Sequence, residues 1–399
     1  MGSLCLRNAL QDNYYIIMRE CRVYFRLCRI SIRLISLCFQ YLNSEVLFFM
    51  FLKKTGVCAL IFAVAAMGMT GCSSNGSGSS FESLSGSIAE ASDRSSDTAD
   101  SASLHVVCTI FPEYDWVKEI LGGHAESAEL TYLLDSGADL HSYQPTADDM
   151  MKISNCDLFV YVGGESDEWV EDALADAANK DMKVINLMDV LGDSAKAEEL
   201  KEGMQGEDEE AEHGDDSEED EEEYDEHVWL SVQNAKVFCK EIEKNIEAVD
   251  AANAADYQAN LDSYIAKLDD LDGKFRALVD GSSVKTLVFG DRFPFRYFVD
   301  DYGLDYYAAF IGCSAETEAS FETIAFLSDK IRELDCKTVF TLENSGKDIA
   351  NTIISTSGQN ADIAELNSLQ SVSKDEIAGG ASYISLMQKN YDVLAGVLK

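Results

Sequence analysis

Two histidines stand in segments whose residue types suit a metal site. His227 follows an acidic run in which fifteen of the twenty residues from 207 to 226 are Asp or Glu, and three apolar residues come directly after it. His141 lies in residues 137–146, GADLHSYQPT. Each histidine therefore stands on a turn just before a predicted helix. Because neutral imidazole is the commonest protein ligand for metal ions, the two histidines predict one shared metal site.

The acidic run before His227 predicts a solvated loop over residues 203–226. Like charges repel one another, and the run has almost no apolar surface to bury. One interpretation is a linker that only adds solubility. The other is that dense carboxylates gather cations near the site. Deletion of residues 205–224 tests this hypothesis, because unchanged metal uptake at scarce zinc would reject it.

Length and charge limit the classes of function. The chain has 399 residues, enough for two or three domains, and 46% of them are hydrophobic, enough for full cores. The formal net charge is −41. Such a charge argues against nucleic acid or an anionic membrane surface as a partner and favours attraction of cations.

Short apolar runs alternate with helical patterns before the acidic loop. Strands are expected at residues 104–111, 129–134, 157–164 and 183–187, with helices at 113–121, 146–154 and 168–179. This alternation is typical of a parallel α/β lobe. Ser231 is then expected to cap a helix over residues 232–249, and Thr146 and Asp149 resemble a capping box.

A longer helix is expected at residues 256–279, with apolar residues at intervals of three and four. At about 1.5 Å per residue it would span roughly 36 Å, enough to cross two lobes. A second α/β set follows, with strands expected at 284–290, 304–310, 338–343 and 363–366 and helices at 293–302, 320–334, 347–356 and 381–398.

The expected fold class is therefore α/β, with two Rossmann-like parallel-sheet lobes joined by a long helix. The N-terminal lobe is expected at residues 104–234, the connecting helices at 235–282 and the C-terminal lobe at 283–399. The carboxyl ends of the second set of strands, where open α/β sheets place their sites, carry Asp291 and Glu343.

The amino-terminal part indicates the compartment. Residues 50–72 have a short positive segment, an apolar core too short to span a bilayer, and Met69-Thr70-Gly71-Cys72, which resembles a bacterial lipobox. Cys72 is the predicted lipidation site, which anchors an extracytoplasmic protein to the cell membrane. Residues 73–103 are expected to be a flexible Ser- and Gly-rich tether. Residues 1–49 fit no part of this signal and are interpreted as a mis-assigned upstream extension.

The remaining cysteines and histidines show no motif of their own. Five cysteines follow Cys72 and none has CxxC spacing, so neither a disulfide framework nor a zinc finger is predicted. A bridge between Cys313 and Cys336 is one alternative, and buried free thiols are the other. His105 and His124 are interpreted as structural.

Taken with their order, these segments resemble the zinc and manganese substrate-binding lipoproteins of bacterial ABC importers. The resemblance covers residues 104 to 399. The lipobox and the two histidine motifs carry it, together with four shorter segments: Thr109-Ile110-Phe111-Pro112, Tyr297-Phe298, Tyr302-Gly303-Leu304 and Ser314-Ala315-Glu316-Thr317-Glu318. It implies one metal ion held in the cleft between two lobes.

The resemblance also implies four ligands, of which His141 and His227 match the first two. The third position falls on Arg292, which cannot ligate, so its neighbour Asp291 is the predicted ligand. The fourth falls around residues 367–370, which are neutral, and Glu343 is the nearest carboxylate that can be proposed. Two imidazoles and two carboxylates suit Zn²⁺ and would also accept Mn²⁺, and zinc is ranked first because such sites bind it more tightly.

The function that the resemblance implies is capture of Zn²⁺ and its delivery to the permease of an ABC transporter, by a monomer that is not an enzyme. Specificity for manganese or iron is the first alternative. A secreted zinc hydrolase would need an open metal position and a general base, and the sequence has no HExxH motif. An adhesin is a third class, for which nothing in the sequence is diagnostic.

Overall fold

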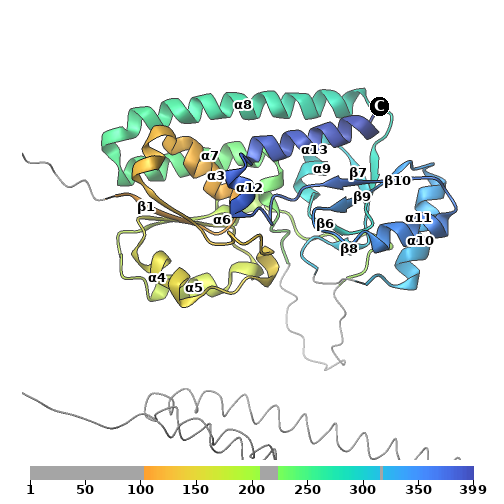
Figure 1. Cartoon of the computed structure of the whole chain (residues 1–399), viewed down its shortest axis with the longest axis horizontal. Coiled ribbons are helices and arrows are strands. Elements are labelled where there is room, and N and C mark those ends of the chain that lie inside the picture. Colours follow the sequence, from red (N-terminus) through yellow and green to blue (C-terminus); the bar gives the residue numbers. More distant parts are fainter. Residues whose placement is uncertain (1–102, 207–222, 315–317) are drawn as a thin grey trace, which may run out of the picture. The chain divides into compact units, whose positions relative to one another are not determined.

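The structure is a computed structural model that describes residues 103–206, 223–314 and 318–399, all of which belong to one compact unit of the chain (Figure 1). The predicted upstream extension (1–49), the signal peptide with Cys72 (50–72), and all but the last residue of the tether (73–103) lie outside the described residues. Most of the predicted acidic loop (203–226) lies outside them as well.

The N-terminal lobe is built on a parallel sheet with the strand order β2-β1-β3-β4. Its strands are β1 (His105–Cys108), β2 (Glu129–Tyr132), β3 (Leu158–Tyr161) and β4 (Lys183–Asn186). The strands read as continuous apolar runs because helices lie on both faces of the sheet, with α3 and α7 on one side and α4 and α5 on the other (Figure 1). The predicted parallel α/β lobe is confirmed.

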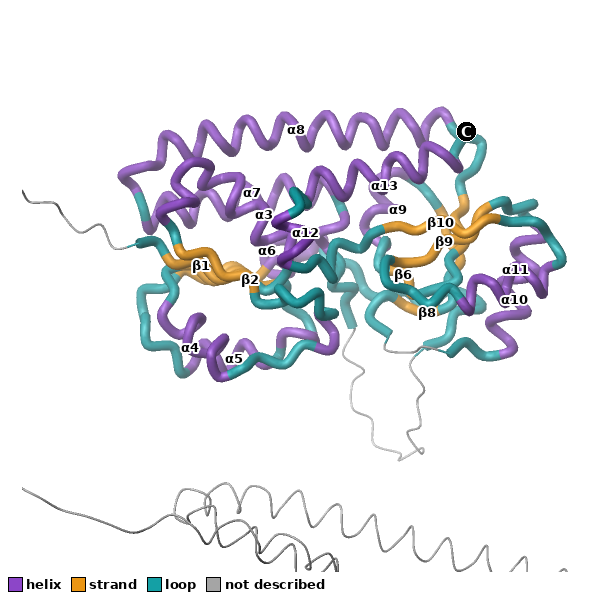
Figure 2. The backbone as a smooth tube through the Cα atoms, viewed as in Figure 1, coloured by secondary structure: helices purple, strands orange, loops and turns teal. Residues whose placement is uncertain are grey.

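The C-terminal lobe holds a second set of parallel strands. β5 (Thr286–Val288) pairs with β7 (Asp305–Tyr307), and β9 (Thr338–Leu342) pairs with β10 (Asp362–Leu366). A parallel bridge between Phe289 and Phe340 joins the two pairs, which gives the order β7-β5-β9-β10. Figure 2 shows the strands of the two lobes as separate orange groups. A further short pair, β6 (Arg292–Phe293) with β8 (Phe310–Ile311), was not predicted.

The described α-helices flank these sheets. They are α3 (Phe111–Leu121), α4 (Ala147–Asn155), α5 (Trp169–Ala175), α6 (Leu187–Leu191), α7 (Val232–Val249), α8 (Ala254–Gly281), α9 (Arg296–Tyr302), α10 (Phe321–Glu333), α11 (Asp348–Ser357), α12 (Lys374–Ala378) and α13 (Tyr383–Val397). The short helices α6 and α12 have no counterpart in the sequence-based expectation.

Helix α8 connects the lobes. Its 28 residues lie against α3 and α7 and also against α9 and α13 of the C-terminal lobe (Figure 1). The predicted apolar face is buried, including Leu268, Leu271 and Phe275. Two lobes joined by a long helix are therefore confirmed as the fold.

Side-chain caps begin the helices where the sequence predicted them. Ser231 Oγ accepts a hydrogen bond from Asn234 N at 3.0 Å. Thr146 Oγ1 accepts from Asp149 N at 3.2 Å, while Asp149 Oδ2 accepts from Thr146 N at 3.0 Å. These bonds satisfy main-chain donors that have no partner inside the helix, so they fix where α7 and α4 begin.

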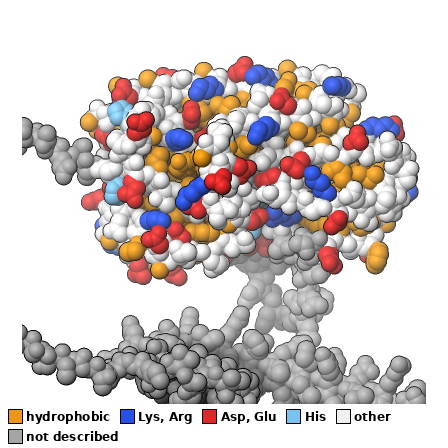
Figure 3. All heavy atoms as spheres, viewed as in Figure 1, with side chains coloured by type: hydrophobic (Ala, Val, Ile, Leu, Met, Phe, Trp, Pro, Cys, Tyr) orange, Lys and Arg blue, Asp and Glu red, His pale blue; other side chains and the backbone are white. Residues whose placement is uncertain are grey.

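The described surface mixes charges of both signs. On the face drawn in Figure 3, acidic and basic side chains are interspersed and do not gather into one charged patch. Ion pairs such as Lys236 with Asp269 link neighbouring helices at this surface. Among the described helices, none combines the length and the apolar character needed to cross a membrane.

Helix α3 begins at Phe111, two residues before the predicted start, because Glu113 caps it from within. Glu113 is fully buried, and its Oε2 accepts hydrogen bonds from Thr109 N at 2.9 Å and Ile110 N at 3.2 Å. Pro112 fits this position because the first turn of a helix needs no main-chain donor there. Burial raises the pKa of Glu113 to about 8, although these hydrogen bonds oppose the rise.

The raised pKa of Glu113 predicts that stability falls as pH rises. Between the ordinary value of 4.5 and about 8, the folded chain holds a proton that the unfolded chain releases. Each such proton lowers the free energy of unfolding by about 1.4 kcal/mol per pH unit. Glu113→Gln should therefore flatten the decline in melting temperature between pH 5 and pH 8, as measured by thermal denaturation. Equal declines in the variant and the wild type would contradict this account.

Candidate metal centre

His227 is held rigidly between the lobes. It precedes the 3₁₀ turn η5 (Val228–Leu230), and its side chain is only 1% exposed. Asp225 Oδ1 accepts a hydrogen bond from His227 N at 2.8 Å and lies 3.0 Å from His227 Nδ1. A carboxylate on Nδ1 orients the ring and makes Nε2 the nitrogen that can bind a metal ion.

His141 is presented by the 3₁₀ turn η2 (Leu140–Ser142). Asp139 caps this turn, because its Oδ1 accepts a hydrogen bond from His141 N at 3.1 Å. His141 Nδ1 lies 2.8 Å from Ser166 Oγ and 3.6 Å from Glu226 Oε2. As with His227, the polar partners lie on Nδ1, and Nε2 points towards the other histidine.

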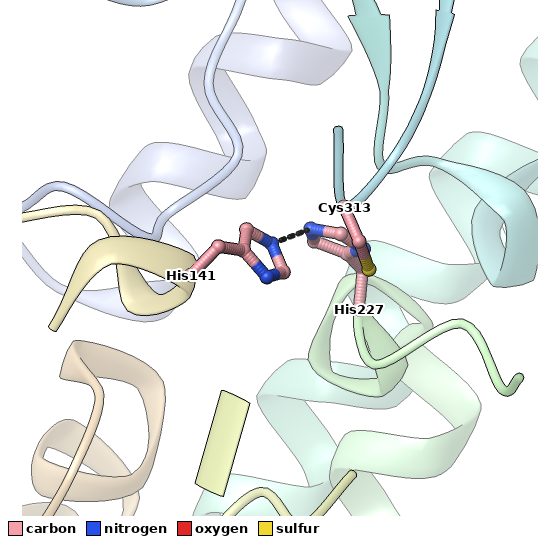
Figure 4. A group of neighbouring side chains, drawn as sticks. All are labelled: His141, His227 and Cys313. Carbon is pink, nitrogen blue, oxygen red and sulfur yellow. Dashed lines mark hydrogen bonds between the residues drawn. The ribbon is translucent and has the colours of Figure 1, made fainter. Parts of the chain in front are cut away.

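The two imidazoles face each other. Their Nε2 atoms are 3.2 Å apart, and their ring centroids are 5.1 Å apart (Figure 4). Burial, then the neighbouring His227, lowers the pKa of His141 to about 3. His141 is therefore a neutral imidazole at neutral pH, the state in which histidine binds metal. The structure brings the two predicted histidines together.

A sulfur atom completes the group. Among the described residues, His141, His227 and Cys313 form a cluster in which one ligand atom from each lies within 4.8 Å of the others. Figure 4 shows the Cys313 side chain beside His227, on a loop that comes from the C-terminal lobe. All five described cysteines are free, so the alternative of a bridge between Cys313 and Cys336 is wrong.

Buried acids surround this cluster. Asp225 and Glu226 are 3% and 2% exposed, and Glu226 Oε2 has no hydrogen-bond partner in the described structure. Burial raises the pKa of Glu226, and it raises that of Glu198 to about 7. Burial, then the charges of Glu198 and Asp225, raises the pKa of the Cys313 thiol. A group of buried acids without a bound cation is electrostatically costly, so the surroundings favour a divalent cation.

The two predicted carboxylate ligands do not join the histidines. Asp291 lines the same cavity as His141, but its Oδ1 accepts a hydrogen bond from Arg292 N at 2.8 Å and its Oδ2 accepts from Leu342 N at 2.9 Å. Glu343 accepts from Ser368 N at 2.7 Å and from Ser368 Oγ at 2.6 Å. Both carboxylates instead fasten strand ends and loops of the C-terminal lobe, so this geometry gives their predicted ligand role no support.

Asp139 ties the His141 turn to the C-terminal lobe. Its Oδ2 accepts a hydrogen bond from Arg292 at 2.7 Å, and its Oδ1 accepts one from Gln370. Although burial opposes ionisation, the Arg292 charge keeps the pKa of Asp139 below its usual value. Asp139, His141 and Arg292 line a cavity of about 500 Å³, which places His141 at a mouth between the lobes.

Three further hydrogen bonds fasten the His227 segment to the C-terminal lobe. Tyr297 OH donates to Asp225 O at 2.9 Å, and Tyr383 OH donates to Trp229 O at 2.8 Å. Trp229 Nε1 donates to Ser368 O at 2.8 Å. All three are buried, so both lobes determine the position of His227.

Sequence reasoning did not identify Asp225, Ser166 or Cys313 as parts of the site. Asp225 was visible only as one of many acids, although its place two residues before His227 is a usable signal. Cys313 directly precedes the Ser314-Ala315-Glu316 segment, but no spacing connects it with either histidine. Ser166 has no local signal, because its role depends on the fold.

Comparisons with known proteins agree with this geometry. A family model described as zinc-uptake complex component A, periplasmic (ZnuA), matches residues 106–397. The chain is 33% identical over 291 residues to the high-affinity zinc uptake system protein ZnuA of Bacillus subtilis, which covers 73% of this chain and 86% of that protein. It is 29% identical to the zinc-binding lipoprotein AdcA of Streptococcus pneumoniae, covering 73% of this chain but 55% of the relative.

A solved structure shares the fold. The crystal structure of the Zn(II)-bound ZnuA-like domain of Streptococcus pneumoniae AdcA matches with a TM-score of 0.57 and 26% identity. The match covers 74% of this chain and 99% of that domain. The chain spans about half of full-length AdcA, and the similarity extends over the whole two-lobe domain.

Proposed function

Because the chain belongs to the zinc-uptake complex component A family, we propose that it captures Zn²⁺ with high affinity between His141 and His227 and delivers it to the permease of an ABC transporter. The family consists of uptake components, and in this proposal the chain is a binding protein and not an enzyme. The zinc ion is its cargo.

The distance between the two Nε2 atoms carries the proposal. Two nitrogens on a tetrahedral zinc ion, with bonds of roughly 2.0 to 2.1 Å, lie about 3.3 Å apart. The Nε2 atoms of His141 and His227 are 3.2 Å apart. The two nitrogens therefore already have the separation that one zinc ion requires, and the ion would take the place of the hydrogen bond between them. The partners of both Nδ1 atoms hold the rings in this arrangement.

Zinc fits the described donors better than manganese does. Mn²⁺ suits carboxylate, carbonyl and water oxygens, whereas imidazole and thiolate suit Zn²⁺. The two carboxylates that would have favoured manganese, Asp291 and Glu343, bind main-chain donors elsewhere. Competitive calorimetric titration should therefore rank zinc above manganese, and the reverse order would favour the manganese or iron alternative.

The expected lipid anchor agrees with delivery at a membrane. A chain attached through Cys72 by the tether at residues 73–103 would carry the captured ion on the outer face of the cell membrane, beside its permease. A monomer suffices in this proposal, because the two lobes of one chain surround the site. Neither the hydrolase nor the adhesin alternative has a specific observation in its favour.

Uptake of radioactive zinc tests the proposal directly. Cells that lack the chain should accumulate the isotope more slowly when zinc is scarce, and the wild-type chain should restore the rate. The double variant His141→Ala/His227→Ala should not restore it. Unchanged uptake in the deletion strain would reject delivery, and absence of zinc binding by the purified wild-type chain would reject capture.

Asp225 should strengthen zinc binding without touching the ion. Its carboxylate lies 3.0 Å from His227 Nδ1 and increases the basicity of the ring. Asp225→Asn keeps an acceptor oxygen but removes the charge, so zinc affinity should fall by roughly 10- to 100-fold. Calorimetry measures the change. Asp115→Asn is the matched control, because Asp115 is also buried but accepts a hydrogen bond from Tyr383 N. Equal affinities in both variants would contradict the role.

A further inference from the structure

We propose that the Cys313 sulfur is the third protein ligand of the captured ion, so that the centre is a two-histidine, one-thiolate site. This inference rests on the proposed function, because it assigns a ligand to the same ion. Among the described residues, Cys313 is the one whose potential ligand atom clusters with those of both histidines.

The loop that carries Cys313 is built for close approach to His227. It follows β8, and Gly312 lies against the His227 ring. A Cβ atom at Gly312 would meet His227 Cε1 and Phe293 O at 3.0 Å each, closer than ordinary contact. Glycine therefore lets the loop reach the imidazole, and the next residue presents its sulfur there.

A hydrogen bond from the opposite lobe holds the same loop. Cys313 N donates to Glu198 Oε1 at 3.2 Å, and Glu198 belongs to the segment that pairs with the residues before His227, since Glu198 N donates to Glu223 O at 2.9 Å. The bond at Cys313 N thus holds this residue beside His227, and the Cys313 thiol makes a hydrogen bond with the main chain of Glu226, the residue directly before His227.

The separations suit tetrahedral zinc. With bonds of roughly 2.3 Å to sulfur and 2.0 to 2.1 Å to nitrogen, a sulfur and a nitrogen on one zinc ion lie about 3.6 Å apart. The ligand atoms of the cluster lie within 4.8 Å of one another. A shift of at most about 1.2 Å, within reach of a side-chain rotation, brings the sulfur to the separation that zinc requires. The thiol proton leaves to solvent as the zinc–sulfur bond forms.

Four other C-terminal polar side chains near the cleft are already engaged. Arg292 carries only donors and pairs with Asp139, and Gln370 donates to the same carboxylate. Asp291 and Glu343 accept main-chain hydrogen bonds. In this proposal, the described part of the C-terminal lobe contributes a sulfur ligand where the resemblance implied oxygen ligands. A thiolate shifts metal selectivity towards zinc and other soft ions and away from manganese.

Cobalt spectroscopy of the full chain tests the assignment. Co²⁺ replaces zinc in tetrahedral sites, and a bound thiolate adds a sulfur-to-cobalt charge-transfer band in the near ultraviolet. The wild-type chain should show this band. Cys313→Ser should lose it and bind zinc at least ~10-fold more weakly, since even partners beyond the ligands change affinity by this factor. Cys336→Ser is the matched control, because the Cys336 sulfur donates to Thr338 O outside the cluster. This variant should keep both the charge-transfer band and the wild-type affinity for zinc.

The outcomes separate this inference from the proposed function. If wild-type chain binds Co²⁺ without the band, while His227→Ala abolishes binding, the sulfur ligand is rejected and zinc capture stands. If the wild-type chain binds neither Co²⁺ nor Zn²⁺, both proposals fail. The wild-type spectrum does not depend on any variant, so poor folding of Cys313→Ser would leave the assignment testable, and Cys313→Ala offers a second comparison.

Discussion

Replacement of His227 with alanine should weaken zinc binding by at least ~100-fold. Changes to partners beyond the ligands already cost roughly 10- to 100-fold, and this change removes a ligand outright. It also leaves Asp225 buried without its imidazole partner. Isothermal titration of the purified chain, with a competing chelator to bring the affinity into range, measures the loss.

A surface histidine provides the control for this experiment. His105 lies 3.6 Å from Glu129 with 44% of its side chain exposed, and such ion pairs contribute little. His105→Ala should bind zinc like the wild-type chain, whereas His141→Ala should lose affinity as His227→Ala does. Retention of wild-type affinity by either His141→Ala or His227→Ala would show that the facing imidazoles are not the site.

Replacement of Trp229 with alanine should lower the free energy of unfolding by about 3–5 kcal/mol. The Trp229 side chain is fully buried. It leaves a large cavity when truncated, and it supplies the hydrogen bond to Ser368 O that joins the lobes. Urea denaturation of the metal-free chain measures the change.

A second tryptophan provides a control that distinguishes the effect of the lost hydrogen bond from the effect of the lost side-chain volume. Trp116 is equally buried, but its Nε1 has no hydrogen-bond partner among the described residues. Trp229→Phe should therefore cost about 1–3 kcal/mol more than Trp116→Phe, the penalty for leaving Ser368 O unsatisfied. Equal costs for the two variants would mean that the hydrogen bond between the lobes adds nothing to stability.

The periodic parts of the fold could be predicted from the sequence because their signals are local. Helix α8 repeats its apolar residues over 28 positions, and Ser231 marks the start of α7 through its own side chain. The short pair β6 and β8 could not be predicted, since two-residue strands exist only where tertiary packing holds them. The start of α3 was also missed, because the cap from Glu113 depends on burying a carboxylate.

Some residues of the candidate site could likewise be predicted from the sequence, and others could not. The two histidines could be predicted because each stands in a distinctive segment. Asp291 and Glu343 were chosen as the carboxylates nearest to the third and fourth ligand positions that the resemblance implies. Proximity in the sequence does not say which acids main-chain donors will occupy. Cys313 is 86 residues from His227 in the chain, and only the folded loop brings them together.

The three buried hydrogen bonds from Tyr297, Trp229 and Tyr383 have a kinetic consequence. An ion leaves quickly only if the atoms that bind it can move away from it one after another. A segment held by three hydrogen bonds resists such movement. We therefore expect a long residence time for zinc on the isolated chain, set by how rarely the turn at His141 or the loop at Cys313 moves away. A transporter that unloads such a carrier must accelerate dissociation itself, and waiting for spontaneous escape would limit its turnover.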